Sequence, residues 1–437
     1  YCSGPAVITR NTISNNSGIA TTMIWDPESD YTWIGSDGGG IYCTDSSATI
    51  ASNTITGNSA SGNGAGLYCN GSWMTVTGNV IANNMANSDA AGGGVWCSGS
   101  GMTLARNTVT GNTAYFGAGI YCSGSTGTVA DNTVMGNTGY DGGGIYCTGS
   151  LAITGNTITG NSGTRGGGIH CGYFSHTTVA GNTISGNSVT CANFRQGGGG
   201  IYCYDSSSPI IRNNTIMNNT ATGAGSLGYG GGIYCDYQSQ PIITNNTIAA
   251  GNSAPSGGAV FCYYAPASIS NTVIAFNSSG IARYNTSGAV LLKYNCIYSN
   301  TAYNFSNLAD PTGTNGNISL DPRLANVPAR DMHIQPGSPC INTGDLAFVP
   351  AAGETDMDGQ PRKIGPRVDI GADEFCWAGD ADFDGSVSIT DLQLLVAAWT
   401  TERGDSGYSP ATDCNNDGAT NVGDLQLLIA NWEKTLY

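Results

Sequence analysis

Two twelve-residue segments near the C-terminus carry oxygen-bearing side chains at matching positions. Residues 380–391 read Asp-Ala-Asp-Phe-Asp-Gly-Ser-Val-Ser-Ile-Thr-Asp, and residues 413–424 read Asp-Cys-Asn-Asn-Asp-Gly-Ala-Thr-Asn-Val-Gly-Asp. Both place oxygen-bearing side chains at loop positions 1, 3, 5, 9 and 12, with a glycine at position 6 for the sharp turn. Ca²⁺ takes about six to eight oxygen ligands, and a loop of this length can wrap them around one ion. The spacing therefore predicts two calcium sites.

The expected ligands follow from the positions in each loop, and the pattern is that of the EF-hand type of calcium loop with Asp at position 12. In the first loop they are Asp380, Asp382, Asp384, the carbonyl of Ser386, Ser388 (directly or through a water) and Asp391. In the second loop they are Asp413, Asn415, Asp417, the carbonyl of Ala419, Asn421 and Asp424. Near-duplicate helical segments, 391–399 and 424–432, follow the loops. This duplication disfavours the alternative of acid-rich turns without metal.

The duplicated loops, the Asp at position 12 and the C-terminal placement resemble a dockerin module over residues 376–437. Dockerins bind cohesin domains and dock secreted proteins on scaffolds or cell surfaces, so the resemblance implies a calcium-dependent partner rather than catalysis. Loop positions 10 and 11 depart from the frequent Ser-Thr pair of cellulosomal dockerins: they are Ile389-Thr390 and Val422-Gly423. Cys376 and Cys414 flank the module symmetrically, and we predict a disulfide between them.

Upstream of this module, two short motifs recur through about 300 residues. A hexapeptide like Gly-Gly-Gly-Ile-Tyr-Cys alternates with Ile-x-x-Asn-Thr-Ile-x-x-Asn, at intervals of 24 to 32 residues between successive cysteines. A repeat of this length indicates a solenoid, propeller or array, and the short β-branched runs exclude helical solenoids. We predict an all-β parallel β-helix of about eleven coils. The repeated cysteines are Cys43, Cys69, Cys97, Cys122, Cys147, Cys171, Cys203, Cys235 and Cys262.

Alternation of side chains along each strand predicts which residues face the core. Ile41 and Cys43 are expected to point inward and Tyr42 outward, and the second motif stacks Ile50 and Ile55 inward in the first full coil. Its asparagines are expected at a corner, in the left-handed conformation, with their amides hydrogen-bonded between coils. The stacked cysteines are compatible with either buried thiols or disulfides between coils. The total of 15 is odd, so at least one thiol stays free or pairs between chains.

These motifs resemble the bacterial right-handed parallel β-helix repeat family over residues 1–305, a family that includes pectate-lyase-like enzymes, adhesins and structural surface proteins. Tyr1-Cys2-Ser3-Gly4 matches the second half of the hexapeptide, so the chain begins within a coil. We expect either further coils upstream or another chain that caps this end. Residues 306–375 lose the period and resemble the closing segment of secreted β-helix proteins. We expect this segment to cap the solenoid, with its acids serving as turn and capping residues.

Catalytic candidates in the solenoid are sparse, because its acids are scattered at about one per coil. The richest group has a solvated corner as its alternative interpretation and contains Arg165, His170, His176, Arg195 and Asp205. An insertion from Trp25 to Trp33 holds three acids and three aromatic residues and is either a sugar- or chain-gripping loop or a lid on the exposed end. No Ser-His-Asp set, phosphate loop or zinc spacing is present.

An outward file of aromatic residues is the broadest expected surface feature. It can stack sugar rings, pack on a partner, or stack on itself up the sheet. Its members are Tyr42, Tyr68, Trp96, Tyr121, Tyr146, His170, Tyr202, Tyr234 and Phe261.

Composition limits the partners. The chain of 437 residues has a net charge of −16, and residues 376–437 alone hold 10 acidic and 2 basic groups. This disfavours nucleic acid and anionic membranes as partners, and no apolar stretch reaches the roughly 18 residues that a membrane span needs. We expect an extracellular or cell-surface structural or adhesive protein that assembles through its calcium-binding module with a cohesin-like scaffold domain or with copies of itself. The start within a coil leaves head-to-tail stacking into filaments open. The alternatives are a scaffold-docked polysaccharide lyase or glycoside hydrolase and a non-catalytic carbohydrate-binding protein.

Overall fold

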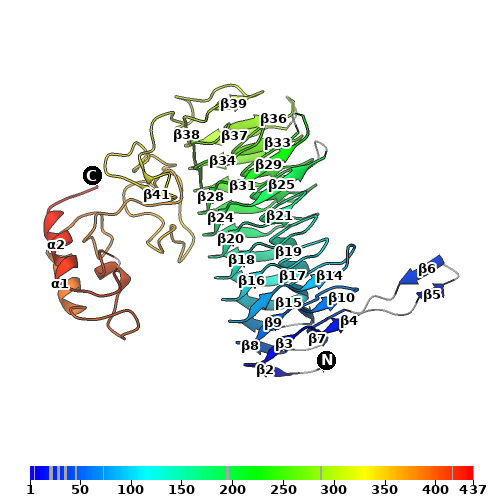
Figure 1. Ribbon diagram of the computed structural model, residues 1–437. Coiled ribbons are helices and arrows are strands. Elements are labelled where there is room, and N and C mark those ends of the chain that lie inside the picture. The colour runs from blue at the N-terminus through cyan, green and yellow to red at the C-terminus, as the bar shows by residue number, and fades with distance from the viewer. Residues whose placement is uncertain are drawn as a thin grey trace.

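The protein is a long parallel solenoid with a compact C-terminal part attached to its side (Figure 1). The computed structural model describes residues 1–3, 5–18, 23–26, 30–33, 37–44, 47–71, 73–192, 196–225, 227–285, 288–415 and 417–436. Among these residues, no helix has both the length and the apolar character needed to cross a membrane.

Each coil has three sides. The first side contributes two consecutive strands to the largest sheet, sheet A, in which all pairings are parallel. Its first set is β1 (Cys2–Ser3), β7 (Ile41–Thr44), β11 (Leu67–Asn70), β22 (Ile169–Cys171), β26 (Ile201–Cys203), β30 (Ile233–Cys235), β33 (Val260–Cys262), β36 (Ile281–Arg283) and β39 (Phe305–Ser306). Its second set is β2 (Val7–Thr9), β8 (Thr49–Ala51), β12 (Thr75–Thr77), β23 (Thr178–Ala180), β27 (Ile210–Arg212), β31 (Ile242–Thr244), β34 (Ala267–Ser270) and β37 (Val290–Lys293). In three coils the two strands are continuous and form one long strand: β15 (Val95–Ala105), β17 (Ile120–Ala130) and β19 (Ile145–Thr154).

Sheet B has eleven strands, one for each coil, as the sequence predicted. They are β3 (Thr12–Ser14), β9 (Thr54–Thr56), β13 (Val80–Ala82), β16 (Thr108–Thr110), β18 (Thr133–Met135), β20 (Thr157–Thr159), β24 (Thr183–Ser185), β28 (Thr215–Met217), β32 (Thr247–Ala249), β35 (Val273–Ala275) and β38 (Cys296–Tyr298). The third side, sheet C, consists of two short sheets: β4 (Ser17–Gly18), β10 (Ser59–Ala60) and β14 (Met85–Ala86), then β21 (Ser162–Gly163), β25 (Ser188–Cys191) and β29 (Thr220–Gly223). The insertion near Trp25 forms an antiparallel pair, β5 (Met23–Asp26) and β6 (Asp30–Trp33), but its side chains lie outside the described part of the chain.

The interior confirms the predicted alternation of side chains. Ile41, Cys43, Ile50 and Ile55 are at most 4% exposed and belong to one continuous core. Burial of each such isoleucine away from water contributes roughly 2 kcal/mol to the stability of the folded chain. The core cysteines are thiols rather than disulfides in the described chain, with Cys97 Sγ only 3.2 Å from Cys122 Sγ in the next coil. Of the two alternatives for the ladder, the structure therefore shows thiols.

The recurring glycines lie where neighbouring coils approach most closely. A Cβ on Gly168 would lie 2.6 Å from the carbonyl oxygen of Gly200 in the next coil, which is closer than any side chain tolerates. The residue type that repeats at this turn is therefore required by contact between backbones.

Two ladders of buried asparagines stabilise the turns on either side of sheet B. Asn156 Nδ2 donates to the Val129 carbonyl (2.8 Å) and to Asn182 Oδ1 (2.9 Å), and the same pattern recurs along the stack. The predicted amide stacking is confirmed, but the predicted backbone conformation is wrong. The left-handed residue is the one before the ladder, for example Ser52 (φ 57°) before Asn53.

The closing segment, residues 306–375, begins over the end of the solenoid as expected, where Leu308 packs against the core and Ile318 pairs with Cys296. Its remainder lies along the outer face of sheet B (Figure 1). It contains the hairpin of β40 (Leu324–Asn326) and β41 (Asp331–Ile334) and buries Met332 and Ile370 against Val273 and Ala249. This placement follows from apolar residues on the outward face of β32 and β35, which need a cover.

Polar contacts also attach the closing segment to the solenoid. Asp345 N donates to Asn271 Oδ1 (2.8 Å), and Glu354 pairs with Arg212 at 2.5 Å. The acids of the segment do act as turn residues: Asp356 accepts hydrogen bonds from the backbone of Asp358 (2.9 Å) and Glu374 (3.0 Å).

The C-terminal module, residues 376–437, contains α1 (Ile389–Ala397), the 3-10 helix η1 (Pro410–Thr412) and α2 (Val422–Ala430). Leu395 and Leu428 are fully buried between the two α-helices. Trp377 packs on both this core and the core of the closing segment, and Asn342 Nδ2 donates to the Leu436 carbonyl (3.2 Å). The module therefore rests on the closing segment.

Candidate functional site

The first acid-rich loop is folded around its own carboxylates. Asp380 accepts hydrogen bonds from the backbone of Asp384 (3.1 Å) and Gly385 (3.0 Å). Asp380 is 2% exposed and Asp391 is completely buried. Carboxylate oxygens of Asp380, Asp382 and Asp384 lie within 4.8 Å of one another. The loop thus gathers the oxygen ligands that a hard cation such as Ca²⁺ prefers.

The second loop repeats these hydrogen bonds with different residues. Asp413 accepts from the backbone of Asp417 (3.0 Å) and Gly418 (2.9 Å), and Asp424 accepts from Asn415 N (3.1 Å). Asp413 is 5% exposed and Asp424 is fully buried. Because two different sequences adopt one arrangement, the spacing of the oxygen-bearing residues determines the loop geometry.

Electrostatic repulsion accumulates at the start of the first loop. Burial is the main cause that raises the pKa of Asp380 to about 7, and the charges of Asp391, Asp384 and Asp382 raise it further. A bound divalent cation would oppose both effects. Its charge stabilises the buried carboxylate in place of water, and it reduces the repulsion among the neighbouring carboxylates.

The same loops also begin the helices. Ser388 caps α1, and Asp391 accepts from the backbone of Ser388 (2.8 Å) in a capping box. Asn421 and Asp424 repeat the capping box at α2. Both helices begin two residues before the segments predicted for them. Ligand positions 9 and 12 therefore couple the loop conformation to the helix.

The outer faces of the two helices are apolar and exposed. Both helices carry β-branched residues at matching positions and are followed by a tryptophan, which leaves an unusually apolar surface for so small a module. The exposed residues are Ile389, Leu394 and Val396 on the first helix with Trp399 just after it, and Val422 and Ile429 on the second with Trp432 just after it.

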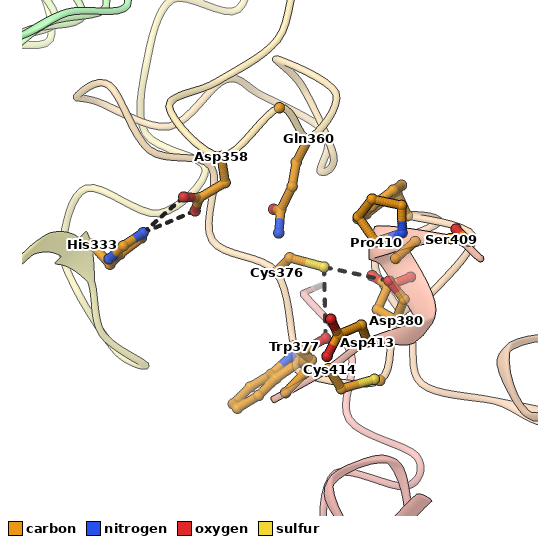
Figure 2. Close-up of a pocket in the computed structure, with 15 residues that line it drawn as sticks. His333, Asp358, Gln360, Cys376, Trp377, Asp380, Ser409, Pro410, Asp413 and Cys414 are labelled. Atoms are coloured by element: carbon orange, nitrogen blue, oxygen red, sulfur yellow. Dashed lines mark hydrogen bonds and ion pairs between the residues drawn. The ribbon is translucent and has the colours of Figure 1, made fainter. Parts of the chain in front are cut away.

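A cavity of about 550 Å³ lies between the closing segment and the module. Figure 2 shows His333 and Asp358 on one side of it and Cys376 and Cys414 on the other. The predicted disulfide between these cysteines is wrong, since both are free thiols. Cys376 Sγ instead lies 3.6 Å from the carbonyl oxygen of Asp380. Burial raises the pKa of Cys414 to about 11, which keeps this thiol protonated.

The histidine of the closing segment lies among carboxylates. His333 Nε2 is 3.0 Å from Asp358 Oδ1, and its Nδ1 contacts Asp331. The hydrogen bond to Asp358 is the main cause that raises the pKa of His333 to about 10, and burial raises that of Asp373 to about 7. From the sequence, these acids are expected only at turns and caps. The one available signal was a single histidine within the acid-rich segment.

The charged candidates of the solenoid are only partly brought together. Arg165 forms two hydrogen bonds of 2.6 Å with Asp141 and lies over the rings of Tyr140 and Tyr204. Burial raises the pKa of Asp141 to about 6, although the charge of Arg165 opposes this shift. Asp141 was not among the residues singled out from the sequence.

Of the other candidates, His170 lies beside Arg165, whose charge acts on its ring. His170 is 1% exposed, and burial holds its pKa well below the usual value. His176 is exposed, and Asp205 accepts a hydrogen bond from Ser206 Oγ (2.9 Å). Arg195 lies outside the described residues.

The aromatic file is a stacked column rather than a continuous surface stripe. Neighbouring rings of Tyr42, Tyr68 and Trp96 are parallel, with centroids 4.7 and 4.3 Å apart. Further along, Tyr121 and Tyr146 stack at 5.0 Å. The expectation of exposure is wrong for Tyr68 in an early coil, which is 8% exposed, and for the last coils, where inserted turns cover the file. The buried members in those coils are His170, Tyr202, Tyr234 and Phe261.

A hollow of about 570 Å³ runs along sheet C beside this column. Met85, Ala114 and Tyr115 line it, and Tyr115 stacks on Tyr140 at 4.6 Å. The hollow ends near the Asp141–Arg165 pair, so an apolar floor and a charged edge adjoin.

Comparison with protein families gave two matches. The family model for the right-handed beta helix region matches residues 1–114 and 118–318, and the model for the dockerin type I domain matches residues 378–431. No curated protein and no solved structure matched the chain. The two family models cover the solenoid and the module, and the closing segment lies mainly between them.

Proposed function

This chain belongs to the right-handed beta helix family and carries a dockerin type I domain, and on that basis we propose that it is a secreted or cell-surface β-helix protein docked on a cohesin-type scaffold domain. The single observation that carries the proposal is the pair of acid-rich loops with one hydrogen-bonding pattern, each beginning a helix with an exposed apolar face. The solenoid is then the part displayed by the scaffold.

Each loop binds one Ca²⁺ ion in this proposal. The first ion is held by carboxylates of Asp380, Asp382, Asp384 and Asp391 together with Ser386 and Ser388. The second is held by Asp413, Asn415, Asp417, Ala419, Asn421 and Asp424. Burial of the first and last ligand of each loop supports this, since buried carboxylates need a compensating charge.

The cohesin-type partner contacts the exposed faces of α1 and α2. Val396 and Ile429 are 60% and 61% exposed, yet neither is polar. Covering such a patch on a partner contributes about 25 cal/mol per Å² of apolar surface. Because the patch occurs once on each helix, loss of binding requires a change on both.

The displayed solenoid has a structural or adhesive role. Its most prominent charged group, the Asp141–Arg165 pair, is engaged in two short hydrogen bonds, and its aromatic column is engaged in stacking. These engagements favour a rigid surface over a catalytic cleft.

Calorimetric titration of the full chain with a cohesin-type domain tests the docking proposal. Binding is expected with calcium and lost with a chelator. The double variant Val396→Glu/Ile429→Glu is expected to weaken binding at least about 100-fold, because charges would be buried in the interface. Val349→Glu is the matched control, since Val349 is 82% exposed in the closing segment. Binding that survives calcium removal or the double variant contradicts the proposal. Light scattering of the same samples reports whether copies of the chain associate instead.

A second candidate function is contact with a polysaccharide in the hollow beside sheet C. The stacked Tyr115 and Tyr140 offer an aromatic surface for sugar rings, next to the charges of Asp141 and Arg165. Incubation with acidic polysaccharides separates the alternatives: product formation supports a lyase or hydrolase, and binding without product supports a carbohydrate-binding role. In either case Tyr140→Ala is expected to weaken the interaction.

A further inference from the structure

The closing segment brings together one imidazole and two carboxylates from distant positions. One ligand atom each of His333, Asp358 and Asp373 lies within 4.8 Å of the other two. His333 lies in β41, Asp358 in a later turn at residues 357–360, and Asp373 in the segment leading to the module. Folding brings these three residues together, because no short sequence motif contains them.

We propose that His333, Asp358 and Asp373 bind a divalent transition-metal ion such as Zn²⁺, at a site separate from the two calcium loops. A set of one nitrogen and two carboxylate oxygens is suited to such an ion, whereas calcium takes oxygen ligands alone.

The neighbours of these residues hold the ligands in a suitable orientation. Asp331 contacts His333 Nδ1, which leaves Nε2 directed at Asp358. A carboxylate on the far nitrogen is the usual partner of a metal-binding histidine, because it fixes the ring and the tautomer. Asp373 is 4% exposed, and its Oδ2 accepts a hydrogen bond from Ile334 N (2.7 Å).

The site opens on the cavity beside the module. His333 and Asp358 line this cavity, and so does Gln360 (Figure 2). The Gln360 Oε1 atom is buried and has no hydrogen-bond partner among the described residues. Three protein ligands leave room for at least one more in a tetrahedral ion, and a water or this amide oxygen can complete the set.

Cobalt titration of the full chain tests the proposal, with calcium in excess to saturate the C-terminal loops. Co²⁺ replaces Zn²⁺ in mixed nitrogen and oxygen sites and gives visible d–d absorption. We expect these bands to saturate at one ion per chain and to disappear when Zn²⁺ is added. A sulfur-to-cobalt charge-transfer band should be absent, because Cys376 and Cys414 are not ligands.

Substitutions locate the site. His333→Gln is expected to abolish the saturable bands, and Asp331→Asn to weaken binding about 10- to 100-fold by releasing the ring. His176→Gln is the matched control, since His176 is exposed on the solenoid. Thermal unfolding of each apo variant checks that it folds, and Zn²⁺ should raise the melting temperature of the wild type but not of His333→Gln.

Four results would overturn the proposal. They are the absence of saturable binding in the wild type, unchanged binding by His333→Gln, a thiolate charge-transfer band, and displacement of Co²⁺ by excess Ca²⁺. The last two would assign the ion to the cysteines or to the calcium loops instead.

Discussion

The solenoid and the C-terminal module both bury polar side chains that hydrogen-bond to the backbone. The solenoid uses neutral amides, which donate and accept, whereas the module uses carboxylates, which only accept. In the solenoid each ladder asparagine accepts and donates: Asn156 Oδ1 accepts from Asn132, and Asn156 Nδ2 donates to Asn182. In the module Asp380 and Asp413 accept from backbone N–H groups in the same way, and a carboxylate has nothing to donate.

The two kinds of side chain differ in whether their charges and hydrogen bonds are balanced without a ligand. In a column of neutral amides, each side chain finds its hydrogen-bond partners in the neighbouring coils, so each coil stabilises the next. A loop of carboxylates satisfies the backbone but leaves negative charge in a partly buried place. We therefore expect the module to need a cation and the solenoid to be stable without one.

Removal of calcium is expected to have the largest effect, and to affect only one of the two regions. A chelator should release each loop and destabilise the module by about 4 kcal/mol per site, if free calcium was about 1,000-fold above its Kd. Hydrogen exchange should become fast in residues 376–437 and remain slow in residues 41–300. Fast exchange in both regions would show that the solenoid depends on the module.

Breaking the asparagine ladder should destabilise the other region. Asn156→Ala removes the donor for the Val129 carbonyl and for Asn182 Oδ1, both buried, and we expect a loss of about 3 kcal/mol in the free energy of unfolding. Asn11→Ala is the matched control, because Asn11 lies at the exposed start of the same ladder and should cost under about 1 kcal/mol. Denaturant unfolding of the solenoid measures both, and equal losses would contradict the ladder argument.

The smallest expected effect concerns pH and the one histidine in the aromatic column. Burial, and then the charge of Arg165, hold the pKa of His170 below its ordinary value of 6.5. The unfolded chain therefore binds a proton below about pH 6.5 that the folded chain excludes, so stability falls as pH is lowered, by up to about 1.4 kcal/mol per pH unit.

His170→Tyr should remove this part of the pH dependence, since tyrosines occupy the neighbouring positions of the column. The measurement is the difference in unfolding free energy between variant and wild type from pH 7 down to about pH 5. His176→Gln serves as the control because its side chain is exposed. A difference that does not grow as pH falls would mean that His170 titrates normally in the folded state.

Features contained within one repeat or one loop were determined by the sequence itself. The calcium loops hold all their candidate ligands within twelve residues, so spacing alone predicts their geometry. The inward positions of Ile50 and Ile55 follow from the alternation of side chains along a strand. The eleven coils follow from repetition of these units, because each unit can bury its apolar face only against the next.

Features that depend on how distant segments pack could be found only from the folded chain. Burial of Tyr202 and Tyr234 results from inserted turns that fold over them, which a local pattern does not specify. The closing segment covers sheet B because the outward residues of late coils are apolar. His333 lies near Asp358 and Asp373 only in the folded chain, because the packing of separate segments brings these side chains together.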